Sequence, residues 1–195
     1  MGDRVEVRHA DFRDVDDGPY DAISSIGMFE HVGFTELAGY FARCHALLRP
    51  EGRLLNHGIS RPHHAGRKHR HWWEPSFIDR SFTERYVFPD GELHEIGNVV
   101  SAIQRAGFEA RHVESLREHY ALTLRCWVRN LEANWDAAVA EVGPARARVW
   151  RLYMAGSAMN FEQGRTSIHQ VLAVRPHPDG RADMPLTRRE LLHWI

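Results

Sequence analysis

The sequence predicts an α/β protein with a mainly parallel, doubly wound sheet. Segments with strand patterns alternate with segments of helical periodicity along the chain. Residues 20–26 form a nearly uninterrupted run of apolar and small residues, which favours a strand buried on both faces. This run leads directly into Phe29, Glu30 and His31. Because open α/β sheets carry their chemistry at the carboxyl ends of the strands, we expect a site here.

The composition bounds the class of protein. The chain has 195 residues, of which 43% are hydrophobic and 26% charged, and its formal net charge is −1. These values indicate one globular domain with a core and no general attraction for nucleic acid. No apolar run approaches the roughly 20 residues of a membrane span, and the charged opening MGDRVEV predicts no signal peptide. Cys44 and Cys126 lie in helical patterns, which fits a reducing, cytoplasmic location.

The first third of the chain contains three predicted strands and one helix. Residues 1–12, with Val5 and Val7 in alternation, predict a strand and its exit, and residues 20–26 predict the second. Residues 52–60 predict the third strand. A helix capped by Thr35 lies between the last two and ends before Pro50 and Gly52. Its apolar residues have helical spacing: Leu37, Tyr40, Phe41, Cys44, Leu47 and Leu48.

The rest of the chain alternates in the same way. Residues 98–116 predict a helix followed by a short strand that a glycine introduces. Two long helices are expected at about 120–142 and 144–161, and residues 167–176 predict the last strand. No Gly-x-Gly occurs anywhere in the sequence, although a nucleotide-binding sheet normally opens with a glycine-rich turn. We therefore expect a sheet that begins at its third strand and lacks the first βαβ unit.

Six segments in this order resemble one family. They are SIGMFEHVG, YFARCHALLRPEGRLLNHGIS, RYVFPDGEL, AGFEARHVESLREHYALTLRCW, MNFEQGRTSIHQVLAV and PLTRRELL. Together they resemble the cyclopropane-fatty-acyl-phospholipid synthases and mycolic-acid cyclopropane synthases, which are class I S-adenosylmethionine-dependent methyltransferases. The resemblance covers nearly all of the chain. It implies that residues 1–195 are the C-terminal part of a single Rossmann-like catalytic domain, truncated at its N-terminus and extended by C-terminal helices.

The resemblance also implies a reaction. The cis double bond of an unsaturated acyl chain attacks the methyl group of S-adenosylmethionine and becomes a carbocation, and loss of a proton from the new methyl closes a cyclopropane ring. A bound bicarbonate takes that proton in this family. By the resemblance, its pocket consists of Glu30, His57, the backbone of Ile59, and Tyr120. The residue types suit this role, because imidazole, phenol and amide groups donate hydrogen bonds to an anion.

Two other sets of residues follow from the same likeness. The expected cofactor contacts are Asp11, Phe12, Gly27 and His31, with Asp11 placed to hold the adenine amino group. Without the glycine-rich turn, we expect S-adenosylmethionine to bind this chain weakly. Aromatic faces attract a carbocation by cation–π interaction. The candidates for this are Phe29, Tyr120, Trp127, Tyr153 and Phe161.

Residues 61–73, RPHHAGRKHRHWW, form a basic and aromatic run without an acid. We expect this run to contact phospholipid headgroups, which would place the protein peripherally on the inner face of the membrane. A solvated loop is the alternative interpretation. Zinc binding is a further interpretation, but the histidines of the run have no ligand spacing typical of a zinc site. The candidate ligands are His63, His64, His69 and His71. A homodimer is compatible with these expectations.

The individual site residues also have simpler interpretations. Glu30 and His31 are suited to a solvated helix entry, His57 to a satisfied core histidine, Tyr120 to a core helix position, and Asp11 to a turn cap. Two alternative functions remain open as well. One is a class I methyltransferase that acts on another lipid or small molecule, or that methylates an acyl chain without closing a ring. The other is a non-catalytic fragment or lipid-binding module. Extra residues before RYVFPDGEL, near the expected acyl site, leave the substrate preference open.

Overall fold

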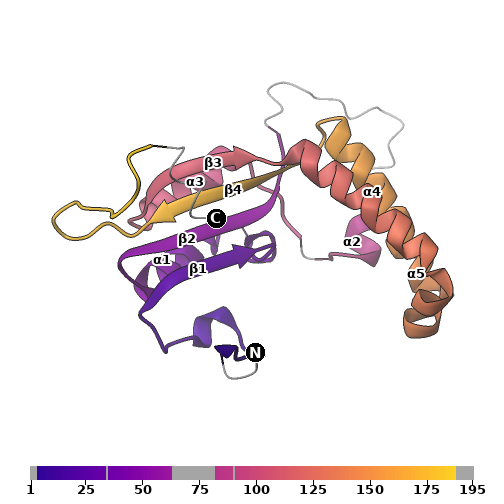
Figure 1. Cartoon of the computed structure of the whole chain (residues 1–195), viewed down its shortest axis with the longest axis horizontal. Coiled ribbons are helices and arrows are strands. Elements are labelled where there is room, and N and C mark those ends of the chain that lie inside the picture. The colour runs from indigo at the N-terminus through magenta and orange to yellow at the C-terminus, as the bar shows by residue number, and fades with distance from the viewer. Residues whose placement is uncertain (1–3, 34, 63–81, 90, 188–195) are drawn as a thin grey trace.

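The computed structural model describes residues 4–33, 35–62, 82–89 and 91–187. In this part of the chain a four-stranded sheet carries helices on one face and a helical hairpin at one end (Figure 1). The strands, in their spatial order, are β1 (Tyr20–Ile26), β2 (Leu48–Ser60), β4 (Ser167–Val174) and β3 (Glu109–Ser115).

The sheet is mixed. β1 pairs with β2 in parallel, whereas β4 is antiparallel to both of its neighbours, β2 and β3. Three strands therefore run in one direction, and β4 runs against them between β2 and β3. The α/β class is confirmed. The expected parallel direction holds for three of the strands, while the antiparallel β4 makes two of the three pairings antiparallel.

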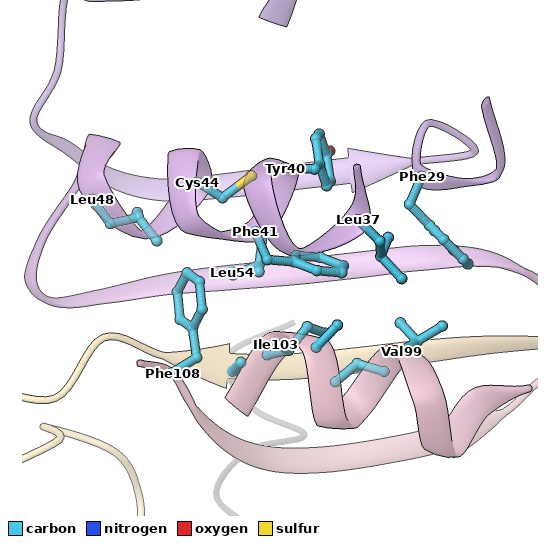
Figure 2. Close-up of a cluster of buried hydrophobic side chains, with 13 residues drawn as sticks. Phe29, Leu37, Tyr40, Phe41, Cys44, Leu48, Leu54, Val99, Ile103 and Phe108 are labelled. Atoms are coloured by element: carbon cyan, nitrogen blue, oxygen red, sulfur yellow. The ribbon is translucent and has the colours of Figure 1, made fainter. Parts of the chain in front are cut away.

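Helices α1 (Leu37–Leu47) and α3 (Ile96–Arg105) cover one face of the sheet (Figure 1). The buried residues of α1 recur at the spacing of one helix face. They meet the buried side chains of α3 and of the central strands, as Figure 2 shows, and Phe41, Leu54 and Ile103 are fully buried. This core fixes the carboxyl ends of β1 and β2, where the site residues lie.

Helices α4 (Arg117–Ala133) and α5 (Trp135–Glu162) form an antiparallel hairpin that extends from the end of the sheet (Figure 1). A second apolar cluster joins the hairpin to β4; its buried members are Ala121, Leu124, Ala158, Phe161 and Ile168. Two exposed ion pairs, Arg125–Glu162 and Arg151–Glu132, connect the two helices. The smaller elements are η2 (Phe12–Asp14), η3 (Phe29–His31) and α2 (Phe82–Tyr86).

Two strand predictions were wrong in part. The described residues before Asp11 form no strand, and Val5 and Val7 are 71% and 92% exposed. Their alternation has no neighbouring strand to pair with in the described structure. The strand Tyr20–Ile26 is correctly placed, but it is not buried on both faces: only Ser25 is buried, and Ile26 is 68% exposed. β1 is an edge strand with a helix layer on one side.

Several helix boundaries also differ from the prediction. Thr35 does not cap α1, because the helix begins at Leu37 after Glu36, which makes no side-chain cap. Leu48 already belongs to β2. The helix expected to reach residue 142 ends at Ala133, where Asn134 bonds back to the carbonyl of Asn130. No helix in the described residues combines the length and hydropathy needed to cross a membrane.

Candidate active site

The end of β1 places Glu30 beside the end of β2. Gly27 follows the strand with a φ of +63°, which favours glycine, and its amide donates to the carbonyl of His57 at 2.9 Å. The chain then enters η3. Glu30 is only 6% exposed, and its Oε1 accepts a hydrogen bond from the amide of Ile59 at 2.7 Å. The carboxylate is thus held across the carboxyl ends of two parallel strands.

The environment of Glu30 favours its neutral form. Burial raises the pKa of its carboxyl, and the Ile59 amide and nearby His31 offset this only in part. Glu30 Oε2 is buried without a hydrogen-bond partner among the described residues. A buried acceptor without a partner costs free energy, on the order of 1–3 kcal/mol. Glu30 therefore presents an unused oxygen.

The amide of Ile59 is already occupied by this contact. A backbone N–H supplies one donor, and in this structure Glu30 Oε1 takes it. The backbone amide of Ile59 therefore holds Glu30 and is not a free donor. The resemblance, in contrast, implies that the backbone of Ile59 contacts the bicarbonate. Ile59 remains part of the site as the group that orients the carboxylate.

His57 and Tyr120 supply two donors. Burial lowers the pKa of His57, so the imidazole is neutral at pH 7, and its Nδ1 is buried without a partner in the described part. Burial, together with the charges of Tyr153 and Glu30, raises the pKa of Tyr120, which keeps the phenol protonated. The Tyr120 ring meets Phe161 edge to face at a centroid distance of 5.0 Å.

These residues line one large cavity of about 920 Å³. It lies between the carboxyl ends of the strands and the α4–α5 hairpin, and Glu30, His57, Ile59 and Tyr120 all contribute to it. The structure therefore brings together the four predicted catalytic residues. The sequence did not single out six other polar residues of the wall, which are Thr83, Glu84, Glu92, Ser157, Asn160 and Thr166.

Aromatic rings form much of the cavity wall. Phe88, Trp150 and Tyr153 contact one another with centroid distances of 5.7–6.4 Å, and the first two were not predicted. Trp127, Tyr153 and Phe161 lie in the cavity as expected. Phe29 does not, because its ring is 2% exposed and packs into the core under the sheet (Figure 2).

A second cavity of about 380 Å³ lies on the other side of η3. Asp11, Phe12 and His31 line it, as predicted for cofactor contacts, whereas Gly27 lines the larger cavity instead. The prediction also missed Glu36, which lies in the wall of the smaller cavity. His31 borders both cavities. The segment 27–31 therefore separates two spaces that have a common wall.

Asp11 also caps a turn, as its simpler interpretation held. Its carboxylate accepts from the backbone and the guanidinium of Arg13, which lowers the pKa of Asp11 to about 2. A carboxylate has further acceptor positions, so this contact leaves room for an adenine amino group. In the basic run, residues 63–73 lie outside the described residues, but Arg61 lines the larger cavity.

The fold is that of the class I methyltransferases. Residues 1–171 match the sequence model of the family described as mycolic acid cyclopropane synthetase. The chain belongs to this family. Its sheet and helices superpose on a crystal structure of a mycolic acid cyclopropane synthase complexed with SAH and CTAB, with a TM-score of 0.73, 32% identity, and coverage of 84% of this chain and 58% of that chain.

Two curated relatives carry methyltransferase names. A protein of Mycobacterium tuberculosis named as a probable fatty acid methyltransferase is 46% identical over 186 residues, which is 95% of this chain and 42% of the relative. A Pseudomonas putida protein of the same description is 42% identical over 195 residues, which is 98% of this chain and 47% of the relative. The chain thus spans less than half the length of either relative.

Proposed function

We propose that this chain acts in an S-adenosylmethionine-dependent methyltransferase that adds a methylene group across the cis double bond of an unsaturated phospholipid acyl chain. One observation carries the proposal. The large, mainly apolar cavity is lined by Glu30 and His57, each of which has one buried polar atom without a partner in the described structure, Oε2 and Nδ1, and it shares His31 with the smaller cavity.

The smaller cavity suits the cofactor. Membership of the family and the relative solved with SAH support S-adenosylmethionine as its occupant. Asp11 and Glu36 offer carboxylates, and Phe12 offers an aromatic ring. Bound S-adenosylmethionine would supply an electrophilic methyl group. Segment 27–31 would then shield the bound methyl donor from water. His31 would contact the ligands of both cavities.

The larger cavity suits an alkene that becomes a cation. Its aromatic faces attract positive charge, each contributing about 0.5–2 kcal/mol. Glu30, His57 and Tyr120 fit a bicarbonate ion: the imidazole and the phenol donate to its oxygens, and Glu30 Oε2 accepts from its O–H. Held there, the ion lies where a base is needed for the proton of the new methyl group. Glu30 orients it, and Ile59 orients Glu30.

A second candidate function is methylation of an acyl chain without ring closure. The names of the two relatives with 46% and 42% identity favour it, since both are described as fatty acid methyltransferases. The same cavity serves either outcome. The difference lies in which carbon loses the proton after methyl transfer.

The location of the reaction is also part of the proposal. An acyl chain inside a bilayer requires the protein to dock at the membrane surface, on the cytoplasmic side, through the basic run at 61–73. Arg61, at the cavity wall, is the basic residue of that run among the described residues. Near an anionic leaflet each such residue contributes about 1 kcal/mol. A homodimer is compatible with this arrangement.

The bicarbonate requirement tests the proposal. The chain is incubated with methyl-labelled S-adenosylmethionine and vesicles of an oleoyl phospholipid, in bicarbonate-free buffer and with bicarbonate added. We expect label in the lipid to depend on bicarbonate, and His57→Ala to lower the rate by about 10²–10³-fold, as loss of one preorganised donor does. Added bicarbonate should restore part of that loss.

The matched control is His119→Ala, since His119 is exposed on α4 and does not line the cavity. This variant should transfer label at the unaltered rate. Full activity of His57→Ala without bicarbonate would contradict the assignment.

A further inference from the structure

Gly58 occupies a place in β2 that has no room for a side chain. It lies between His57 and Ile59 and lines the large cavity. Its backbone is ordinary extended strand, so conformation does not require glycine. Space does: a Cβ atom there would lie 2.0 Å from Cε1 of Phe29 and 2.9 Å from Oε1 of Glu30. Such a glycine marks a close approach.

We propose that Gly58 is a positioning residue of the active site, whose missing side chain lets the Phe29 ring and the Glu30 carboxylate lie directly against β2. In this position Glu30 Oε1 reaches the amide of Ile59, Oε2 is buried without a partner among the described residues, and the residue lines the large cavity. The catalytic value of that position rests on the proposed function of Glu30, but the contact itself does not.

The packing around Phe29 leaves no free space into which its ring could move. Its ring is 2% exposed, belongs to the main core cluster and lies 6.3 Å from the ring of His94. Protein cores are packed about as densely as organic crystals, so a displaced ring displaces its neighbours. Because Phe29 and Glu30 are adjacent in η3, moving the ring also moves the carboxylate. A methyl group at position 58 should therefore break the bond from Ile59 to Glu30.

The hydrogen bond from the Ile59 amide should affect the titration of Glu30. The Ile59 amide stabilises the ionised carboxylate, so its loss should raise the pKa of Glu30 beyond the increase that burial already causes. The other titratable and charged groups that interact with Glu30 or line the same cavity come from η3 itself and from the elements around it. They are His31, Tyr40, His57, Arg61, Glu84, Glu92, Tyr120 and Tyr153. A change at Gly58 replaces none of these side chains.

The test follows the amide resonance of Ile59 by ¹⁵N NMR as the pH is raised. In the unaltered chain this resonance should shift with the ionisation of Glu30, with a midpoint above the ordinary glutamate value. In Gly58→Ala it should lose most of that pH-dependent shift. The ring atom Cδ1 of Phe29 would also lie only 2.8 Å from the added Cβ. In Gly58→Ala/Phe29→Leu, which removes Cε1 and replaces the rigid ring by a smaller side chain that can turn away, much of the shift should return. Phe29→Leu alone supplies the reference.

Gly97→Ala is the matched control, because a Cβ atom at Gly97 meets nothing within 4 Å. It should leave the Ile59 titration unchanged. An unchanged titration in folded Gly58→Ala would overturn the proposal, and so would a double variant that shows no recovery. If Gly58→Ala fails to fold, refolding by Phe29→Leu supports the proposal, and failure of both variants overturns it. A methyl-transfer rate that does not depend on bicarbonate would refute the proposed function, but it would not change the pH-dependent shift of the Ile59 amide.

Discussion

His31 is a single residue that lines both cavities. Its side chain borders both spaces, and its ring lies 5.6 Å from the ring of Phe88, a member of the aromatic wall. Phe88 in turn contacts Trp150 and Tyr153. The imidazole therefore supports the aromatic wall of the larger cavity while it lines the smaller one, which are the proposed acyl and cofactor sides.

Replacing His31 should weaken both ligands. In His31→Ala, the loss of the contact with Phe88 should cost about 1 kcal/mol of acyl-lipid binding, the scale of one aromatic pair, and S-adenosylmethionine should also bind more weakly. Glu36→Ala should weaken only the cofactor, because Glu36 lines the smaller cavity alone. Titration calorimetry with each ligand separates these effects. Unchanged binding of both ligands by His31→Ala would contradict a shared wall.

The convergence of Glu30, His57 and Tyr120 on one cavity could be predicted from sequence because each belongs to a motif placed at a strand end or on a helix. Glu30 and His57 follow or lie within strands whose apolar patterns are clear, and Tyr120 lies in a strongly helical segment. Gly58 and Trp150 were missed for a physical reason. A strand glycine and a helical tryptophan acquire their roles only from neighbours that are distant in sequence, such as Phe29 and Phe88.

At the scale of the elements, the α4–α5 hairpin builds one side of the large cavity. α5 is interrupted at Gly143, whose φ of 79° and ψ of 159° are not helical, and Pro144 follows. This conformation is essentially restricted to glycine. The turn redirects the helix before the segment that carries Trp150 and Tyr153.

Two glycines of α5 should respond in opposite ways to alanine. Gly143→Ala forces a side chain into a conformation that costs about 1–3 kcal/mol, so the free energy of unfolding should fall by that order. Gly156→Ala meets nothing within 4 Å and lies in regular helix, so it should raise the free energy of unfolding by about 0.5–1 kcal/mol. Urea denaturation measures both. Equal effects would contradict the interruption at Gly143.

The elements differ in how far their sequence specifies them. β2 and β4 were located by their apolar runs, and α3 by its amphipathic spacing. The end of α4 was not located, because the apolar pattern continues past Asn134 and only the local hydrogen bond to Asn130 ends the helix. The exposure of β1 depends on which layers cover the sheet, and that is a tertiary property.

At the scale of the whole molecule, a cavity of about 380 Å³ and a cavity of about 920 Å³ border one short segment. The sheet fixes segment 27–31 through β1 and β2, and the helical hairpin closes the larger space from the other side. Family membership supports methyl transfer from S-adenosylmethionine, and in the proposed function the methyl donor and the alkene meet beside His31. In the proposed function, a base held by Glu30, His57 and Tyr120 determines the fate of the new methyl group.

The number of deuterium atoms in the product tests this account most directly. The chain is incubated with millimolar S-adenosylmethionine carrying a CD₃ group and with an oleoyl phospholipid, and the acyl chains are analysed by mass spectrometry and NMR. A base beside the new methyl group removes one deuteron, so the account predicts a cyclopropane whose added carbon keeps two. A product that retains all three deuterium atoms would show that the proton leaves another carbon. That result, or no transfer to lipid at all, would contradict the account.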